Sequence, residues 1–215
     1  MNVPVRGVYA ITDCQDLDSV QLFHITERIL HAGIAMLQYR DKATDPELRI
    51  YRANQLHKLC AAWQVPFIIN DDLELAQNIG ADGVHLGRDD VSLASARKVL
   101  GSAAIIGVSC YNRLPDALLA RDQGADYVAF GSFFPSRTKP GAVRALPELL
   151  VRAKDMLDIP LVAIGGITQE NGGILVRSGA DLLAIITGIY GEDNPEQAAR
   201  NFNQIFDTYR ENHHS

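Results

Sequence analysis

Eight short apolar runs, rich in valine and isoleucine, recur along the chain and predict eight β-strands. The runs are continuous rather than alternating, which is typical of strands that are buried on both faces. They cover residues 7–12, 35–40, 66–70, 83–87, 104–109, 127–133, 160–165 and 182–187.

Segments with helical periodicity separate these runs. Asp45 followed by Pro46 predicts the cap and first turn of a helix whose apolar stripe continues to Trp63. Other helical patterns cover residues 73–79, 92–100, 147–157 and 168–176, and a last helix begins after Asn194, where a capping box is expected. Eight strand–helix units in 215 residues predict an α/β fold, the (β/α)8 TIM barrel. Because no linker interrupts the units, we expect a single domain, residues 1–215, with a short polar C-terminal tail.

The barrel prediction locates the active site, because barrel enzymes assemble it at the carboxyl ends of the strands. A doubly wound dinucleotide-binding sheet is disfavoured, since no GxGxxG turn is present.

Composition narrows the choice of partners. The net charge is −6 and no block of Lys or Arg stands out, which argues against nucleic acid and anionic membranes as partners. No apolar run approaches the roughly 18 residues of a membrane span, and no signal peptide is evident. Cys14, Cys60 and Cys110 form no CxxC pair and suggest reduced thiols in a cytoplasmic protein. Small molecules are the expected ligands; the oligomeric state, with a homo-oligomer among the options, stays open.

Acidic pairs follow the third and fourth predicted strands. Asp71 and Asp72 come after Asn70, and Asp89 and Asp90 end the next unit. Carboxylates at neighbouring strand ends can share Mg²⁺, which takes one or two protein carboxylates and completes its shell with substrate phosphates and water. The alternative is helix capping or solvation, and Asp72, directly before a helix, fits capping well.

The second strand ends with Gln38, Arg40 and Lys42, which alternate and can therefore project the same way toward an anionic ligand. The alternative is a surface salt-bridge cluster with Asp41 and Asp45.

The fifth and sixth strand ends add hydroxyls and cations. Ser109 suits a phosphate or oxyanion donor, while Cys110 is interpreted as packing. The segment after residue 133 contains Ser136, Thr138 and Lys139 and predicts a lid over phosphate, with an ordinary flexible loop as the alternative.

Glycines follow strands seven and eight, where barrels often bind phosphate. Gly165 and Gly166, and later Ile186 with Thr187 and Gly188, would let backbone N–H groups approach a phosphate at a helix N-terminus. Two anion regions on one rim predict two phosphate-bearing ligands.

In combination, these segments resemble the thiamine phosphate synthase family over nearly the whole chain. The segments are YAITD, QYRDK, IINDD, GVHLGRDD, GVSC, FFPSRTKPG, AIGGI and ITGIYG. The resemblance implies a Mg²⁺-dependent transferase that joins 4-amino-2-methyl-5-(diphosphooxymethyl)pyrimidine to 4-methyl-5-(2-phosphooxyethyl)thiazole, forming thiamine phosphate and releasing pyrophosphate.

The resemblance also implies residue roles. Asp71 and Asp90 would bind Mg²⁺. The pyrimidine diphosphate would be held by Gln38, Arg40, Lys42, Asn70, Ser109 and Lys139, of which Arg40, Lys42, Ser109 and Lys139 are the expected catalytic groups. The thiazole phosphate would be held by Ser136, Thr138, Gly166, Ile186 and Thr187.

Three positions depart from the family pattern. Arg88 stands where Gln is expected and adds a cation beside the metal carboxylates, whereas Ser136 for Thr and Thr187 for Ser keep their hydroxyls. Two rivals remain: a thiazole tautomerase of the same fold, and a non-catalytic phosphate-sensing barrel. Neither needs both Asp71 and Asp90 together with Arg40, Lys42 and Lys139, so their joint presence favours the synthase.

Overall fold

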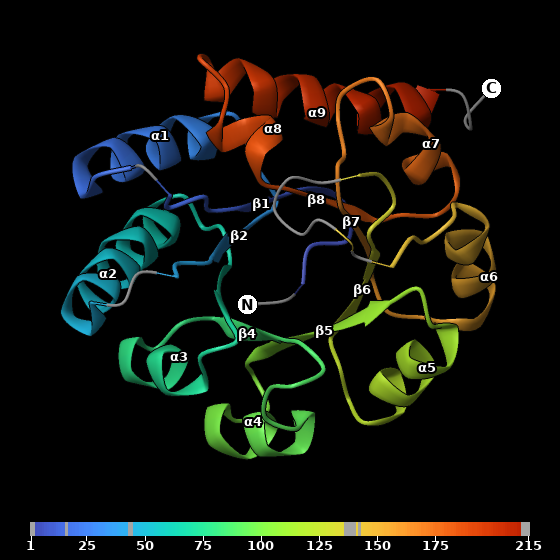
Figure 1. The fold of residues 1–215 in the computed structure, drawn as a ribbon, viewed down its shortest axis with the longest axis horizontal. Helices are drawn as coiled ribbons and strands as arrows, with labels where there is room; N and C mark the ends of the chain where they lie inside the picture. The colour runs from blue at the N-terminus through green and yellow to red at the C-terminus, as the bar shows by residue number, and fades with distance from the viewer. Residues whose placement is uncertain (1–2, 16, 43–44, 136–140, 142, 212–215) are drawn as a thin grey trace.

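The computed structural model describes residues 3–15, 17–42, 45–135, 141 and 143–211. Eight parallel strands form a closed barrel in the order β1 to β8, and helices surround it (Figure 1). The strands are β1 (Gly7–Ile11), β2 (Met36–Tyr39), β3 (Phe67–Asn70), β4 (Gly83–Leu86), β5 (Ile105–Tyr111), β6 (Tyr127–Gly131), β7 (Leu161–Ile164) and β8 (Leu182–Ile185). The prediction of a (β/α)8 barrel is confirmed.

The helices follow the strands in order. They are α1 (Ser19–His31), α2 (Pro46–Ala62), α3 (Leu73–Ile79), α4 (Leu93–Leu100), α5 (Leu114–Asp122), α6 (Glu148–Met156), α7 (Gly172–Arg177), α8 (Thr187–Tyr190) and α9 (Pro195–Glu211). Helix α9 packs against α1, α7 and α8, so the C-terminal helix lies beside the N-terminal one (Figure 1).

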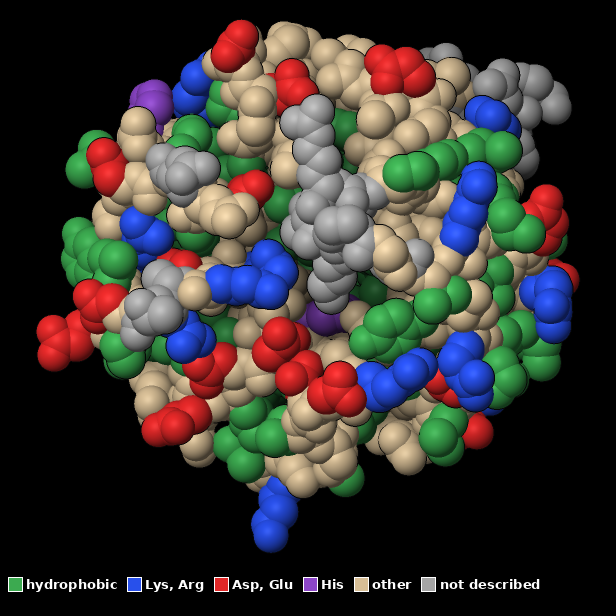
Figure 2. Space-filling view, in the orientation of Figure 1, with side chains coloured by type: hydrophobic (Ala, Val, Ile, Leu, Met, Phe, Trp, Pro, Cys, Tyr) green, Lys and Arg blue, Asp and Glu red, His purple; other side chains and the backbone are tan. Residues whose placement is uncertain are grey.

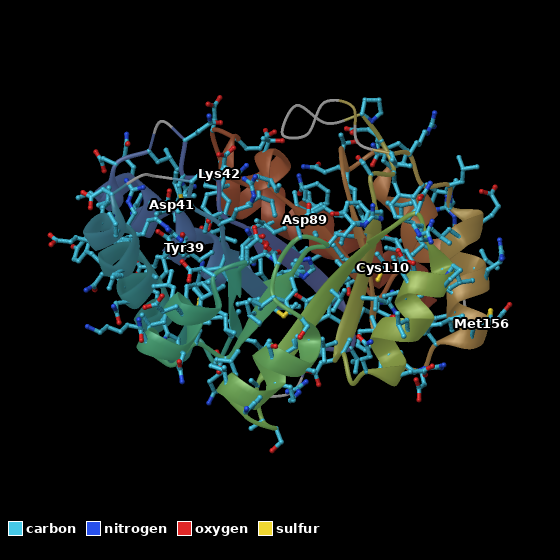
Figure 3. The ribbon with its side chains drawn as sticks, turned by 60° about the horizontal axis from the view of Figure 1, so that its bottom comes forward. Tyr39, Asp41, Lys42, Asp89, Cys110 and Met156 are labelled. Atoms are coloured by element: carbon cyan, nitrogen blue, oxygen red, sulfur yellow. The ribbon has the colours of Figure 1, made fainter. Side chains whose placement is uncertain are left out.

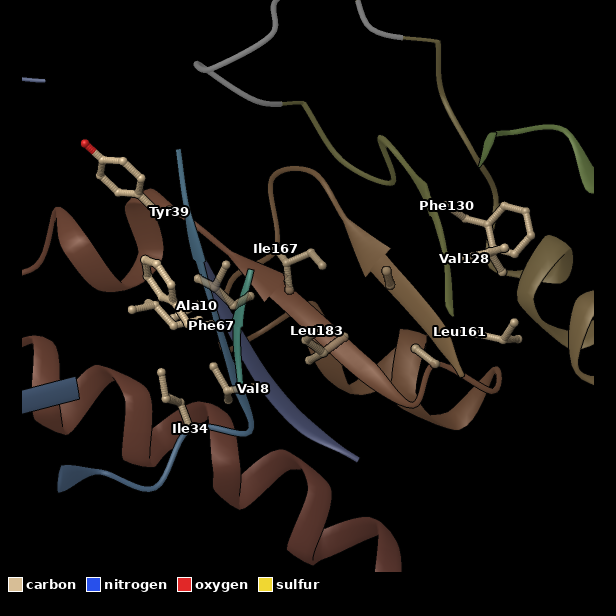
Figure 4. Close-up of a cluster of buried hydrophobic side chains, with 14 of the residues drawn as sticks. Val8, Ala10, Ile34, Tyr39, Phe67, Val128, Phe130, Leu161, Ile167 and Leu183 are labelled. Carbon is tan, nitrogen blue, oxygen red and sulfur yellow. The ribbon is translucent and has the colours of Figure 1, made fainter. Parts of the chain in front are cut away.

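Alternating strand residues build two cores. Val8, Ala10 and Leu183 belong to the core between the barrel and its helices (Figure 4), whereas Tyr9 and Ile11 belong to the core inside the barrel. Seven of the eight strands, all except β4, contribute apolar residues to both cores, which explains the continuous runs in the sequence. Fully burying each aliphatic or aromatic side chain of this kind contributes about 1.5–3 kcal/mol.

Several predicted boundaries were wrong. Strand β5 continues to Tyr111, and Thr187 is the first residue of α8 rather than the end of a strand. Helix α7 begins at Gly172 instead of residue 168. The Asn171 side chain accepts from the Thr168 N–H (2.8 Å) and donates to the Gly166 carbonyl (3.0 Å), which holds the intervening residues in a turn.

Helices α1 and α5 were not predicted. Helix α1 begins with a capping box in which Asp18 and Gln21 satisfy each other's backbone N–H groups. Within the described ranges, no helix combines the length and apolarity needed to cross a membrane.

Candidate active site at the carboxyl ends of the strands

The end of β2 places Gln38, Arg40 and Lys42 at increasing distance from the core. Gln38 is buried inside the barrel with 2% exposure, Arg40 is half-buried, and Lys42 is exposed at the rim (Figure 3). Thr12 on the neighbouring strand end fixes the backbone here, because its hydroxyl accepts from the Arg40 N–H (2.8 Å) and donates to the Arg40 carbonyl (3.1 Å). The backbone that carries Arg40 is thus fixed at the mouth, two residues before Lys42.

The acidic residues beside these cations have other partners. Asp41 pairs with Arg52 of α2 (3.1 Å), and Asp45 caps α2 by accepting from Glu47 N–H (2.9 Å) and Leu48 N–H (3.2 Å). Within the described part of the chain, Arg40 and Lys42 form no ion pair through their side chains. Among the described residues, no carboxylate therefore competes with an anionic ligand for these two charges.

Asp71 turns the chain out of β3. Its φ of +64° lies in the left-handed region, which Asp tolerates better than most residues with a side chain. The Asp71 N–H donates to the His85 carbonyl (2.9 Å), and Asn70 Nδ2 donates to Asp71 Oδ2 (2.6 Å). These bonds tie an exposed carboxylate at the end of β3 to the end of β4.

Asp72 is a cap, as its position before α3 indicated. Its side chain accepts from Leu75 N–H (2.9 Å) and pairs with Arg49 (2.7 Å). It is therefore engaged in holding α2 and α3 together.

The segment after β4 carries the second carboxylate. Asp90 Oδ2 accepts from Gly87 N–H (2.6 Å), which fixes the orientation of a half-buried side chain, while Asp89 is exposed at the same rim (Figure 3). No group of three or more His, Cys, Asp or Glu side chains capable of holding a metal occurs among the described residues. Mg²⁺ bound through phosphate and water needs only one or two protein carboxylates, so the oxygen donors of Asp71 and Asp90 fit this ion by type and number.

Arg88 turns toward β5. Its guanidinium lies 4.8 Å from the centre of the Tyr111 ring, and its Nη2 lies 3.9 Å from Asp116 Oδ2. Tyr111 itself has a φ of +53°, an unusual backbone conformation for an aromatic residue. Arg88, which stands where Gln is expected, thus interacts with the Tyr111 ring of β5 and the Asp116 carboxylate of α5.

A chain of hydrogen bonds crosses the barrel interior beneath the mouth. Gln38 Nε2 donates to the Tyr9 hydroxyl (2.7 Å), which lies 2.8 Å from the Tyr127 hydroxyl. The Tyr127 hydroxyl lies 2.9 Å from His85 Nδ1, and His85 Nε2 lies 2.8 Å from Ser109 Oγ. Five different strands supply these five side chains. Two of them, Gln38 and Ser109, had been predicted from the sequence to bind substrate.

Sequence reasoning missed Tyr9, His85 and Tyr127. Each stands inside a run that was interpreted only as a buried strand. The available signal was the polar group itself, because a buried Tyr hydroxyl or imidazole requires a hydrogen-bond partner.

The ends of β7 and β8 have the close backbone packing that phosphate binding uses. Gly165 (φ +106°) and Gly166 (φ +58°) have conformations that favour glycine. A Cβ at Gly165 would collide with Ser132, and one at Gly166 would collide with the Pro135 carbonyl. Helix α8, four residues long, starts at the exposed Thr187, so its first N–H groups have no intrahelical acceptors.

Ser136, Thr138 and Lys139 lie outside the described residues, and so does most of the predicted lid.

On the face that Figure 2 shows, acidic side chains gather beside basic ones near the middle of the molecule. The mouth of the barrel therefore presents both signs of charge, which suits a metal bound together with an anion.

A family model described as "Thiamine monophosphate synthase" matches residues 8–189. The chain belongs to this family. The "Thiamine-phosphate synthase" of Azoarcus sp. (strain BH72) is 50% identical over 96% of this chain and 100% of its own length. That of Aromatoleum aromaticum is 48% identical over 94% of this chain and 97% of its own length. The structure of "Thiamine phosphate pyrophosphorylase" from Pyrococcus furiosus superposes with a TM-score of 0.85 at 28% identity, covering 94% of this chain and 96% of that one.

Membership of the thiamine monophosphate synthase family confirms the resemblance drawn from the sequence, and with it the expectation of a transferase. The structure brings Gln38, Asn70 and Ser109 to one end of the barrel, at the ends of β2, β3 and β5. Their roles toward substrate stay predictions, as do those of Gly166, Ile186 and Thr187 at the ends of β7 and β8.

Proposed function

We propose that this member of the family joins 4-amino-2-methyl-5-(diphosphooxymethyl)pyrimidine to 4-methyl-5-(2-phosphooxyethyl)thiazole. The products are thiamine phosphate and pyrophosphate. One observation carries the proposal: a single rim holds carboxylates and cations at β2 to β5, and elsewhere a glycine turn after β7 and the N-terminus of α8 after β8. Two distinct anion regions suit two substrates that each bear phosphate.

The carboxylates suit a magnesium ion. Asp71 and Asp90 would hold Mg²⁺, which would supply positive charge to the diphosphate and make it a better leaving group. The hydrogen bonds from Asn70 to Asp71 and from Gly87 N–H to Asp90 would orient the two carboxylates before the ion binds.

The remaining groups at β2 to β5 would stabilise the departing diphosphate. The bond between the pyrimidine methylene carbon and the diphosphate oxygen breaks, and its electron pair leaves with the diphosphate. Arg40, Lys42 and Lys139 would balance that charge, and the Ser109 hydroxyl would donate to it. The aminopyrimidine delocalises the resulting cation, so no protein nucleophile is required.

Cys110 fits this mechanism as a spectator. Burial raises the pKa of its thiol to about 12, so it stays protonated at neutral pH and is a poor nucleophile. The side chain is fully buried against the helix-facing core.

The second substrate would attack from the other side of the mouth. Gly166, Ile186 and Thr187, with Ser136 and Thr138, would hold its phosphate and direct the thiazole nitrogen at the cationic carbon. A fixed phosphate handle makes the attack effectively unimolecular.

Pyrophosphate release with both substrates, with each alone, and with EDTA added tests this proposal. We expect release only with both substrates, and loss of release with EDTA. Conversion of the thiazole phosphate alone without metal would identify a tautomerase, and binding without turnover would identify a phosphate sensor.

A further inference from the structure

The hydrogen-bond chain under the mouth has a direction. Gln38 Nε2 donates to Tyr9, so the Tyr9 oxygen is an acceptor and its own hydrogen needs another acceptor. The other side-chain bond described for this hydroxyl is to Tyr127. Since Tyr9 is 1% exposed, a hydroxyl hydrogen without an acceptor there would be costly. Tyr9 therefore donates to Tyr127.

The same reasoning continues along the chain. Tyr127, which is fully buried, accepts from Tyr9 and donates to His85 Nδ1. Burial raises the pKa of both tyrosines, so both keep their hydrogens at neutral pH. A neutral imidazole that accepts at Nδ1 carries its hydrogen on Nε2. His85 Nε2 then donates to Ser109 Oγ, 2.8 Å away.

Ser109 is the member of this hydrogen-bond chain that lies nearest to the mouth of the barrel. Its oxygen accepts from His85, so its hydroxyl hydrogen is not used within the chain. Ser109 is half-buried near the carboxyl end of β5, whereas the groups behind it are buried. The hydrogen is thus directed to a ligand in the mouth.

We propose that His85, Tyr127 and Tyr9 are positioning residues that fix the Ser109 hydroxyl as a hydrogen-bond donor to the diphosphate, with the Gln38 amide setting the direction. This role rests on the proposed function. No proton is transferred; the chain orients hydrogens before the substrate arrives, so that the Ser109 hydrogen bond strengthens as charge develops on the leaving oxygen.

The tautomer of His85 in the substrate-free protein tests the direction without any enzyme assay. Long-range ¹H–¹⁵N correlation spectra of histidine-labelled protein, assigned with His85→Gln, should show the Nε2–H form. Tyr127→Phe removes the group that donates to Nδ1, so the preference for the Nε2–H form should weaken and the signals should move toward a mixture of the two tautomers. Gln38→Glu, which places an acceptor against Tyr9, should reverse the chain and give Nδ1–H.

Tyr190→Phe is the matched control. The Tyr190 hydroxyl is buried and bonds to Thr26 Oγ1 (2.9 Å), so this variant also loses one buried tyrosine hydroxyl, but outside the chain. It should leave both the His85 tautomer and kcat unchanged.

Kinetics test the consequence. Tyr127→Phe should lower kcat for pyrophosphate release about tenfold or more while changing KM for the thiazole phosphate less than twofold. Adding Ser109→Ala to Tyr127→Phe should lower kcat by a smaller factor than Ser109→Ala does alone, because the two hydroxyls act as a unit.

An Nδ1–H tautomer in the wild type, or additive effects of the two substitutions, would overturn the inference. Absence of pyrophosphate release in the wild type would instead refute the proposed function, and the tautomer would still report on the chain.

Discussion

Arg52 and Asp41 form a buried ion pair, with 3.1 Å between Nη1 and Oδ2 and side-chain exposures of 8% and 3%. Arg52 also donates to the Leu17 carbonyl (2.8 Å) and to Ser19 Oγ (3.1 Å), while the Tyr39 hydroxyl donates to Asp41 (2.8 Å). Helix α2 is thereby tied to the segment after β1 and to the end of β2. Asp41 lies between the two cations that we assign to the diphosphate, so this pair anchors them.

Removing Arg52 should destabilise the protein strongly. Arg52→Ala leaves the buried Asp41 carboxylate without its cation, and such changes cost about 3–5 kcal/mol. Urea unfolding monitored by circular dichroism measures the free energy of unfolding. Arg52→Lys keeps the charge but loses the planar fork, so we expect a smaller loss of stability and a raised KM for the pyrimidine diphosphate.

Arg113→Ala is the control for that measurement. Its pair with Asp116 is exposed (2.9 Å), and such pairs contribute about 0–1 kcal/mol. Equal losses of unfolding free energy in Arg52→Ala and Arg113→Ala would show that the buried pair contributes no more to stability than the exposed one.

Lys139→Ala should impair the chemical step. If Lys139 balances charge on the departing diphosphate, its loss should lower kcat by roughly a hundredfold, in the range known for removing one preorganised donor. Single-turnover pyrophosphate release measures this, and Lys98→Ala, a substitution on the exposed face of α4, is the matched control. A change confined to KM for the thiazole phosphate would contradict the assignment.

Alkaline pH should lower the stability of the fold. Burial raises the pKa of Cys60 well above its ordinary value of 9.0, so above pH 9 the unfolded chain loses a proton that the folded protein keeps. The free energy of unfolding then falls as pH rises, by about 1.4 kcal/mol per pH unit for each such group. Urea unfolding from pH 8 to pH 10.5 should give a shallower decline for Cys60→Ala than for the wild type. Parallel declines would show that this thiol is not responsible.

The barrel could be predicted because its strands are continuous apolar runs, a pattern that survives errors in element boundaries. The boundaries themselves depended on side-chain contacts across the chain. Asn171 delays the start of α7 through two local bonds, and Asp18 with Gln21 starts α1, which periodicity had not revealed. Such contacts cannot be read from hydrophobic pattern alone.

Some residues of the candidate site could likewise be predicted from the sequence, and others could not. Asp71 and Asp90 stood out because acidic residues at strand ends break an apolar pattern, and family resemblance then supplied their roles. Tyr9, His85 and Tyr127 did not stand out, because their polar atoms meet only when the eight strands close into a barrel. The sequence shows which residues are present, but not which polar groups face one another across the barrel.

The central claim is that Asp71 and Asp90 together hold the magnesium ion that assists departure of diphosphate. Pyrophosphate release measured against Mg²⁺ concentration tests it for the wild type, Asp71→Asn and Asp90→Asn, with the exposed neighbour Asp89→Asn as control. We predict that each of the first two substitutions raises the Mg²⁺ requirement at least tenfold and lowers the saturating rate, while circular dichroism shows an intact fold. A Mg²⁺ dependence identical to that of the wild type in either variant would contradict the claim.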